Sequence, residues 1–202
     1  MAIKAIIFDM EGVLMITRDK DLPTSWAKSL NAPYDAVREA FHSEMNDKSD
    51  LGEITQIEFD QYLIKTLGLG NDSVPIVRQV VDEQCFIDEI ILEKIQELKK
   101  DYKIGLLSNY SKLMREKIEN EWNIKHLFDD IIISCEVGVI KPDPAIFELA
   151  LSRLGVSTSE AVLIDDRVKN IEGAHQFGLH AIHFLSRDQA LQDLDELLKT
   201  EK

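Results

Sequence analysis

The sequence predicts an α/β fold: a Rossmann-like parallel sheet flanked by helices, with a small helical cap inserted after the first strand. Two observations lead to this prediction. Five short apolar runs, with helical patterns between them, are typical of strands buried on both faces; the runs are residues 3–8, 104–107, 131–133, 161–164 and 181–185. Residues 17–83 form the exception, because their patterns are helical and contain no convincing strand.

The helices that follow the strands have recognisable ends. Asp88 can cap a helix that runs to Lys100, and Ser111 can open another that runs to Trp122. Asp143 followed by Pro144 is an N-cap with proline at the first helical position, which predicts a helix over residues 144–154 before a glycine. The last two core helices are expected at residues 170–177 and 187–198.

The predicted cap divides the chain into two domains. Residues 1–16 and 84–202 are expected to form the α/β core, and residues 17–83 the cap, with helices at 25–30, 34–45, 55–67 and 73–81. A cap over the carboxyl edge of the sheet would exclude water and contact the substrate's leaving group. Its candidate pocket residues, for which packing in the cap's own core is the commoner role, are Trp26, Phe41, His42, Met45 and Tyr62.

Composition excludes several classes of partner. The 202 residues carry a net charge of −14, which disfavours nucleic acid and anionic membranes. No apolar run approaches the roughly 20 residues that span a bilayer, so a cytoplasmic protein is expected. Cys85 and Cys135 are predicted to be buried thiols outside any disulfide or zinc site, and His175, His180 and His183 to be structural because they lack one-face ligand spacing.

Acidic and polar residues follow the predicted strands. Asp9 and Glu11, with Gly12 to turn the chain and expose amides, come after the first strand, and Ser108-Asn109 after the second. Each group alone has an ordinary explanation: an acidic turn, or a helix cap.

Two further groups complete the pattern. Lys141 precedes a helix between prolines, and Asp165-Asp166 follow the fourth strand. A surface lysine and a helix N-cap pair are their ordinary explanations, but adjacent acids at a buried strand end repel each other unless a cation holds them. Because carboxyl ends of parallel strands meet at one edge, the joint pattern predicts a site for Mg²⁺ and phosphate there.

The blocks IIFDMEGVL, LLSNYS, VIKPDPAIFELAL and VLIDDRVKNIEGA together resemble, in order, the four motifs of the haloacid dehalogenase-like hydrolases. The resemblance extends to sugar-phosphatase-like members and the phosphatase domain of soluble epoxide hydrolases, which share the DDxxxN form of the last block. It implies a Mg²⁺-dependent phosphatase acting on a small phosphorylated metabolite, such as a sugar phosphate.

The resemblance also implies a role for each motif residue. Asp9 would be the nucleophile that becomes phosphorylated, Lys141 the cation that screens it from the phosphate, and Ser108, with the amide of Asn109, the phosphate anchor. Gly12 would contribute to phosphate binding, and Asn170 would steady Lys141 or Asp166. Mg²⁺ would be held by Asp166 with Asp165, by Asp9 and by the backbone carbonyl of Glu11.

The sequence departs from the family pattern at Glu11, because phosphatases of this family usually carry an Asp there as general acid and base. The extra methylene moves the carboxyl group by roughly an ångström, a displacement that can cost on the order of 10²-fold in rate. Three hypotheses remain open: a phosphatase in which Glu11 serves as acid and base, a 2-haloacid dehalogenase-type hydrolase with Arg18 as a candidate anion-binding residue, and a catalytically weak phosphoryl-binding or regulatory protein.

Overall fold

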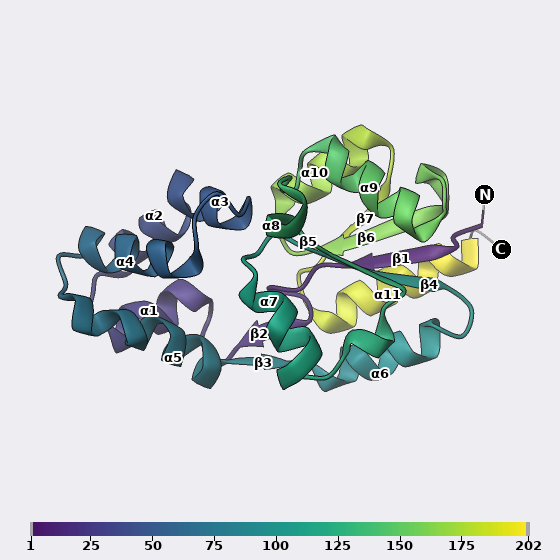
Figure 1. Ribbon diagram of the computed structural model, residues 1–202. Helices are drawn as coiled ribbons and strands as arrows, with labels where there is room; N and C mark the ends of the chain where they lie inside the picture. Colours follow the sequence, from purple (N-terminus) through teal and green to yellow (C-terminus); the bar gives the residue numbers. More distant parts are fainter. Residues whose placement is uncertain (1, 201–202) are drawn as a thin grey trace.

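The computed structural model describes residues 2–200 and confirms the predicted α/β fold. Five parallel strands form one sheet in the order β5-β4-β1-β6-β7 (Figure 1). Phe8, the last residue of β1, pairs with Leu106 of β4 and Ile164 of β6, so the chain leaves these neighbouring strands at one edge. The strands are β1 Ala5–Phe8, β4 Lys103–Ser108, β5 Asp130–Ile133, β6 Ala161–Asp165 and β7 His180–His183.

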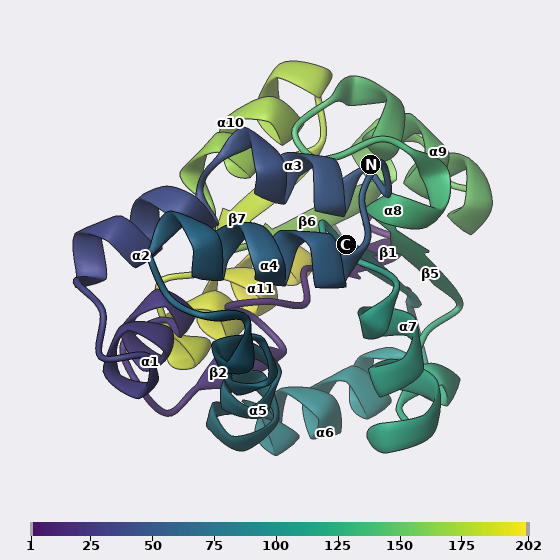
Figure 2. The same ribbon diagram turned by 60° about the vertical axis from the view of Figure 1, so that its left-hand side comes forward.

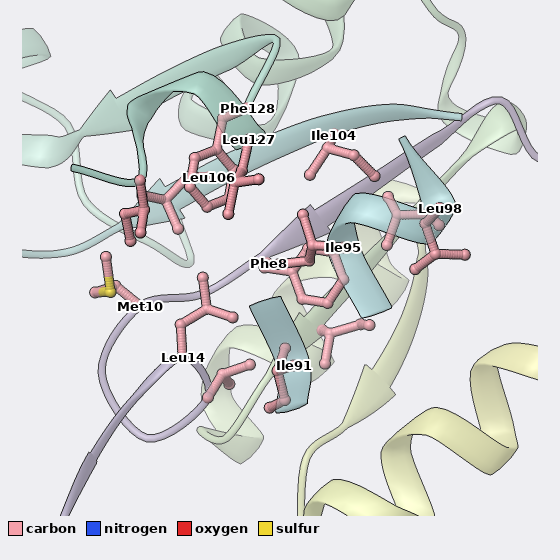
Figure 3. Packing of buried hydrophobic residues seen from close by; sticks show 14 of the residues in the cluster. Phe8, Met10, Leu14, Ile91, Ile95, Leu98, Ile104, Leu106, Leu127 and Phe128 are labelled. Atoms are coloured by element: carbon pink, nitrogen blue, oxygen red, sulfur yellow. The ribbon is translucent and has the colours of Figure 1, made fainter. Parts of the chain in front are cut away.

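Helices cover both faces of this sheet because successive residues of β1 point to opposite sides. Ile6 and Phe8 belong to the cluster that includes apolar residues of α6 (Glu89–Leu98) and α11 (Arg187–Thr200), part of which is shown in Figure 3. Ala5 and Ile7 pack in a second cluster with α9 (Pro144–Leu154) and α10 (Val168–Phe177). The sheet is therefore held between two layers of helices.

The helix ends follow the local chemistry that the sequence predicts. Asp143 accepts the amide of Ala145, Pro144 occupies the first turn of α9, and Gly155 ends the helix at φ +65°. Asp88 caps α6 by accepting the amides of Ile90 and Ile91. The core is completed by α7 Leu113–Glu116, a π-helical turn η2 Lys117–Glu121, α8 Ser134–Val137, and the 3-10 turns η3 Lys125–Leu127 and η4 Thr158–Glu160.

A helical insert follows β1, as predicted, and has an apolar core of its own. Figure 1 shows it beyond the carboxyl edge of the sheet, away from the two chain ends. Its elements are α1 Leu22–Ser29, α2 Tyr34–Phe41, α3 Glu44–Asp50, α4 Gln56–Thr66, η1 Asn71–Ser73 and α5 Val74–Gln84. We call this insert the cap; the boundaries at 16/17 and 83/84 stay a prediction.

Two short strands were not predicted, and two expectations about helix bounds were wrong. Two short strands, β2 Met15–Thr17 and β3 Cys85–Ile87, pair antiparallel and join the cap to the core, but three residues are too few for a periodic signal. The expected helix over 34–45 is two helices, because Ser43 is extended and its hydroxyl donates to the carbonyl of Ala40. The expected helix over 111–122 begins at Leu113 and passes into the π-helical turn, and the buried hydroxyl of Ser111 caps nothing.

Two composition-based expectations have structural outcomes. Cys85 and Cys135 are free, as predicted, but they are only partly buried, so the prediction of buried thiols was wrong in its degree. Burial raises the pKa of the Cys85 thiol to about 12 and that of Cys135 to about 11, which keeps both protonated near neutral pH. Within residues 2–200 no helix is both long enough and apolar enough to cross a membrane.

Candidate active site

Lys141 lies at the centre of the residues that the sequence places at strand ends. Its side chain is fully buried, and its ammonium group contacts Asp9 Oδ1 at 2.8 Å, Asp165 Oδ2 at 2.6 Å and the carbonyl oxygen of Leu107 at 2.8 Å. An ammonium group has three donors, so each has a partner. Burial would lower the pKa of Lys141, but Asp165 and Asp9 outweigh it and raise that pKa.

The Asn109 side chain fixes the backbone of Lys141. Its amide nitrogen donates to the Lys141 carbonyl at 3.0 Å, and its oxygen accepts the Lys141 amide at 2.8 Å. This two-point contact ties the loop after β4 to the segment before α9. The Asn109 side chain therefore positions Lys141, while its backbone amide stays a proposed phosphate contact.

The adjacent carboxylates Asp165 and Asp166 have different surroundings. Asp165 accepts hydrogen bonds from Lys141, from the side-chain amide of Asn170 at 2.9 and 3.0 Å, and from the backbone amide of Arg167 at 2.9 Å. Burial opposes ionisation of Asp165, but Lys141 outweighs it and the pKa is lowered. The Asn170 amide holds Asp165, which in turn accepts from Lys141, and the predicted role of Asn170 in steadying Lys141 or Asp166 stays a prediction.

Asp166 is the carboxylate that lacks a cation. Its Oδ1 atom is buried and has no hydrogen-bond partner within the described part of the chain. Burial, followed by the charge of Asp165, raises the pKa of Asp166, and the same two causes raise the pKa of Asp9. An additional positive charge beside these two groups would lower both pKa values.

A divalent cation fits this cluster. Oxygen atoms of Asp9, Asp165 and Asp166 lie within 4.8 Å of one another, and three carboxylates against one lysine leave two negative charges uncompensated. Hard cations such as Mg²⁺ take oxygen ligands of this kind. Gly12, at φ +81°, leaves the space for Asp166, because a Cβ atom there would lie 2.5 Å from Asp166 Oδ2.

Ser108 ends β4 beside this cluster. Its side chain is completely buried, and its hydroxyl has no hydrogen-bond partner among residues 2–200. A buried hydroxyl without a partner is costly, so such a group at a strand end is suited to a polar ligand atom. This placement agrees with the predicted role of Ser108 as a phosphate anchor.

Glu11 does not join the three-carboxylate cluster. Its Oε2 atom lies 3.9 Å from Arg167 Nη2, and the side chain is 23% exposed. Burial raises the pKa of Glu11, and the charge of Arg167 opposes that shift. Sequence reasoning missed Arg167, although its place directly after the Asp165-Asp166 pair puts it at the same sheet edge as the candidate site.

Two cavities border the site between core and cap. The smaller, about 430 Å³, is lined by Glu11, Asn109 and Arg167 and by the cap residues Trp26 and Phe41. The larger, about 740 Å³, is lined by Gly12, Asp166 and His42, among others. Of the candidate pocket residues, Trp26, Phe41 and His42 thus line a cavity. Met45 and Tyr62 pack against the apolar core of the cap.

Other candidates lie away from the chemistry. Arg18 is exposed and stacks over the ring of Phe86 at 5.4 Å, outside the residues that line either cavity. His183 contacts the backbone carbonyl of Asp166 at 3.0 Å, a structural role. Among the described residues, the three-carboxylate cluster is the one group with metal-ligand geometry, and it contains no histidine or cysteine.

This fold and this strand-end cluster define a class of α/β hydrolases. A family model described as haloacid dehalogenase-like hydrolase matches residues 3–178, and the chain belongs to that family. The family resemblance of the four sequence blocks is therefore confirmed, and with it the expectation that the chain is a hydrolase.

Known relatives cover the chain to different extents. Bifunctional epoxide hydrolase 2 of Sus scrofa is 26% identical over 98% of this chain, but the chain spans only 39% of that relative's length. Phosphatase MT3486 of Mycobacterium tuberculosis is 26% identical, over 98% of this chain and 96% of its own length.

A solved structure has the same fold. It is a HAD family enzyme of Bacteroides thetaiotaomicron in complex with magnesium and inorganic phosphate. The alignment has a TM-score of 0.73 at 22% identity and covers 90% of this chain and 94% of the other.

Proposed function

We propose that this hydrolase is a Mg²⁺-dependent phosphatase that cleaves a small phosphate monoester through an aspartyl-phosphate on Asp9. The observation that carries the proposal is the cluster around Lys141, in which one buried cation contacts Asp9 and Asp165 while Asp166 is left without a partner. The names of Phosphatase MT3486 and of the magnesium and phosphate complex support it.

Asp9 is positioned to attack phosphorus. Lys141 and the amide of Met10, at 2.7 Å, both bond to Oδ1 of Asp9. Oδ2 has no such bond among the described residues and can form the new bond to phosphorus. As the oxygen–phosphorus bond forms, the bond from phosphorus to the leaving alcohol breaks, and Lys141 and Ser108 offset the charge that develops on the phosphoryl oxygens.

Glu11 is the proposed acid and base. It would donate its proton to the leaving oxygen in the first step and accept one from water in the second, when water attacks phosphorus and frees Asp9. Burial raises the pKa of Glu11, which favours the protonated carboxyl group that the first step requires, and Glu11 lines the cavity that would hold the leaving group.

Mg²⁺, when bound, would supply positive charge that offsets repulsion between the phosphate and the carboxylates. Asp9, Asp166 and the backbone carbonyl of Glu11 would hold it. Asp165 belongs to the same cluster, but its oxygens are engaged by Lys141, Asn170 and an amide, so its proposed role is to orient Lys141.

A small monoester, such as a sugar phosphate, is the proposed substrate class. The support is the volume of about 430 Å³ on the leaving-group side, which is large enough for a small metabolite. The net charge of −14 disfavours phosphorylated nucleic acid. The dehalogenase alternative loses support because Arg18 lies outside both cavities, and a pure binding protein has no use for the carboxylate nucleophile.

The test is hydrolysis of p-nitrophenyl phosphate, with and without Mg²⁺, by the wild type and Asp9→Asn. Metal-dependent turnover that disappears in Asp9→Asn is expected, whereas Asp72→Asn, an exposed cap variant, should match the wild type. Turnover equal in wild type and Asp9→Asn would overturn the proposal. Glu11→Gln should lose turnover while Glu11→Asp retains it, if Glu11 carries the proton.

A further inference from the structure

Both apolar and charged residues line the cavity of about 430 Å³. Cap residues Trp26, Phe41, Phe59 and Val77 supply apolar surface, and the cap also contributes Asp50 from the end of α3. The core contributes Glu11, Tyr110 and Arg167. A leaving group bound here would therefore contact carbon surface and charged groups together.

Most charged residues in this cavity neutralise one another. Arg78 bonds to Asp60 at 3.0 Å, and Lys117 contacts Asp82 at 2.7 Å and Glu121 at 2.8 Å. Arg167 faces Glu11 at 3.9 Å. The three cationic residues on the cavity wall are therefore all paired with carboxylates.

Asp50 differs from these residues because no ion pair in the described chain includes it. Its side chain accepts one hydrogen bond, from the Asn46 amide one turn earlier at 3.2 Å. Burial, and then the charge of Glu11, raise the pKa of Asp50 to about 7, which reflects the lack of a cation close enough to offset them. The cavity thus holds a carboxyl group with unused acceptor capacity.

Contacts with the core fix the place of Asp50. The Ser134 hydroxyl of α8 donates to the backbone carbonyl of Asp50 at 2.5 Å and accepts the amide of Tyr110 at 3.0 Å. Gly52 packs so closely that a Cβ atom there would lie 2.6 Å from the carbonyl oxygen of Cys135. Figure 2 shows α3 beside α8, so the backbone at Asp50 is held against the core.

We infer that Asp50 is a specificity-determining residue, which selects phosphate monoesters whose leaving group carries a hydrogen-bond donor, above all an ammonium group. This inference rests on the proposed phosphatase function. A donor would use the free acceptor of Asp50, and a cation would add charge attraction in a water-poor cavity. A leaving group with a carboxylate or a second phosphate would face Asp50 and Glu11 and be repelled.

The experiment uses a matched series of alkyl phosphates that end in an ammonium, hydroxyl, methyl or carboxylate group, with two to five methylenes. The wild-type kcat/KM should follow that order at the best chain length, with about tenfold or more between ammonium and carboxylate. Asp50→Asn should reduce this ratio by about tenfold, mainly through KM, and Asp50→Glu should keep the preference at a shorter chain length.

Control measurements distinguish an effect of the Asp50 carboxylate on specificity from misfolding and from failure of the proposed phosphatase reaction. Asp47→Asn removes the same charge from an exposed position on α3 and should leave the wild-type ratio unchanged. Binding of the same phosphates to Asp9→Asn, with and without Asp50→Asn, is measured by calorimetry, which needs no turnover. If no ester is hydrolysed, the proposed function fails while binding still tests Asp50.

The inference is overturned if the wild type hydrolyses or binds the ammonium and carboxylate esters equally. It is also overturned if Asp50→Asn, with thermal unfolding showing that it folds, keeps the wild-type ratio. Loss of the preference in folded Asp50→Asn, together with its retention in Asp47→Asn, would support it.

Discussion

The core cluster around Lys141 and the cavity that contains Asp50 both place carboxylates in buried surroundings. The two sites differ in how many hydrogen-bond partners they give each carboxylate. In the core, Asp165 accepts hydrogen bonds from Lys141, from the Asn170 side chain and from a backbone amide. All three donors of the Lys141 ammonium group have partners. In the cavity, the Asp50 carboxyl group accepts one hydrogen bond, from a side-chain amide of its own helix.

The difference separates two tasks. Groups that act on every substrate can be fixed in advance, because the phosphoryl group is always the same, and rigid surroundings keep them in place. A residue that distinguishes leaving groups must keep a hydrogen-bond acceptor free for the ligand. That free acceptor lowers the stability of the folded protein to some extent. Each of the following predictions tests one side of this comparison.

The largest effect is expected for Lys141→Met. The substitution leaves Asp9 and Asp165 buried and facing each other without a cation, which should cost about 3–5 kcal/mol in the free energy of unfolding. Turnover should fall by at least about 10²-fold. Chemical denaturation and p-nitrophenyl phosphate hydrolysis measure both. Lys112→Met, at an exposed lysine, is the control, and wild-type stability in Lys141→Met would contradict the described core.

Gly12→Ala should act on the metal more than on the fold. The added methyl group would meet Asp166 Oδ2 at 2.5 Å, so the Mg²⁺ concentration for half-maximal activity should rise by roughly 10–100-fold. Gly178→Ala shares the positive φ, +88°, but its nearest new contact is 3.7 Å away. If both variants change Mg²⁺ dependence alike, backbone strain and not Asp166 is responsible.

Gly52→Ala tests the docking of α3 on the core. Its Cβ would lie 2.6 Å from the Cys135 carbonyl oxygen, whereas Gly68, with a similar positive φ of +69°, has open space around it. Both Ala variants should lose about 1 kcal/mol to strain. Gly52→Ala alone should raise KM by about tenfold through displacement of the cap residues. Equal kinetics in the two variants would mean that this contact does not position the cavity.

The smallest effect is a pH-dependent gain in stability for Asp50→Asn. The folded protein holds the Asp50 proton up to about pH 7, whereas the unfolded chain releases it near 3.8, so folded protein binds more protons between these values. Wild-type stability should therefore fall as pH rises through this window, and asparagine removes the loss. Denaturation should show the variant more stable than the wild type at about pH 8 and equal to it near pH 4. An equal difference at both pH values would exclude the titration of Asp50 as the cause.

Sequence patterns predicted the core well because its signals are local. The helix after Lys141 is marked at both ends, by Asp143-Pro144 and by Gly155, and the strands are apolar runs that end in polar turns. The arrangement of Asp9, Lys141 and Asp165 follows from parallel topology, which brings strand ends together.

The parts that were missed depend on contacts distant in sequence. Asp50 lies on a short helix of mostly polar residues, and its place over the core depends on Ser134, 84 residues away. The orientation of Glu11 toward Arg167 is likewise a long-range contact, since 156 positions separate the two residues, and sequence spacing does not predict it.

The most direct test of the central claim is to trap the phosphorylated enzyme. Wild-type protein is mixed with excess p-nitrophenyl phosphate and Mg²⁺, quenched in acid within the first turnovers, digested, and the peptides are analysed by mass spectrometry. The account predicts one phosphoryl group on the peptide that contains Asp9, absent without Mg²⁺ and absent in Asp9→Asn. Turnover without that modification, or a phosphoryl group on another residue, would contradict it.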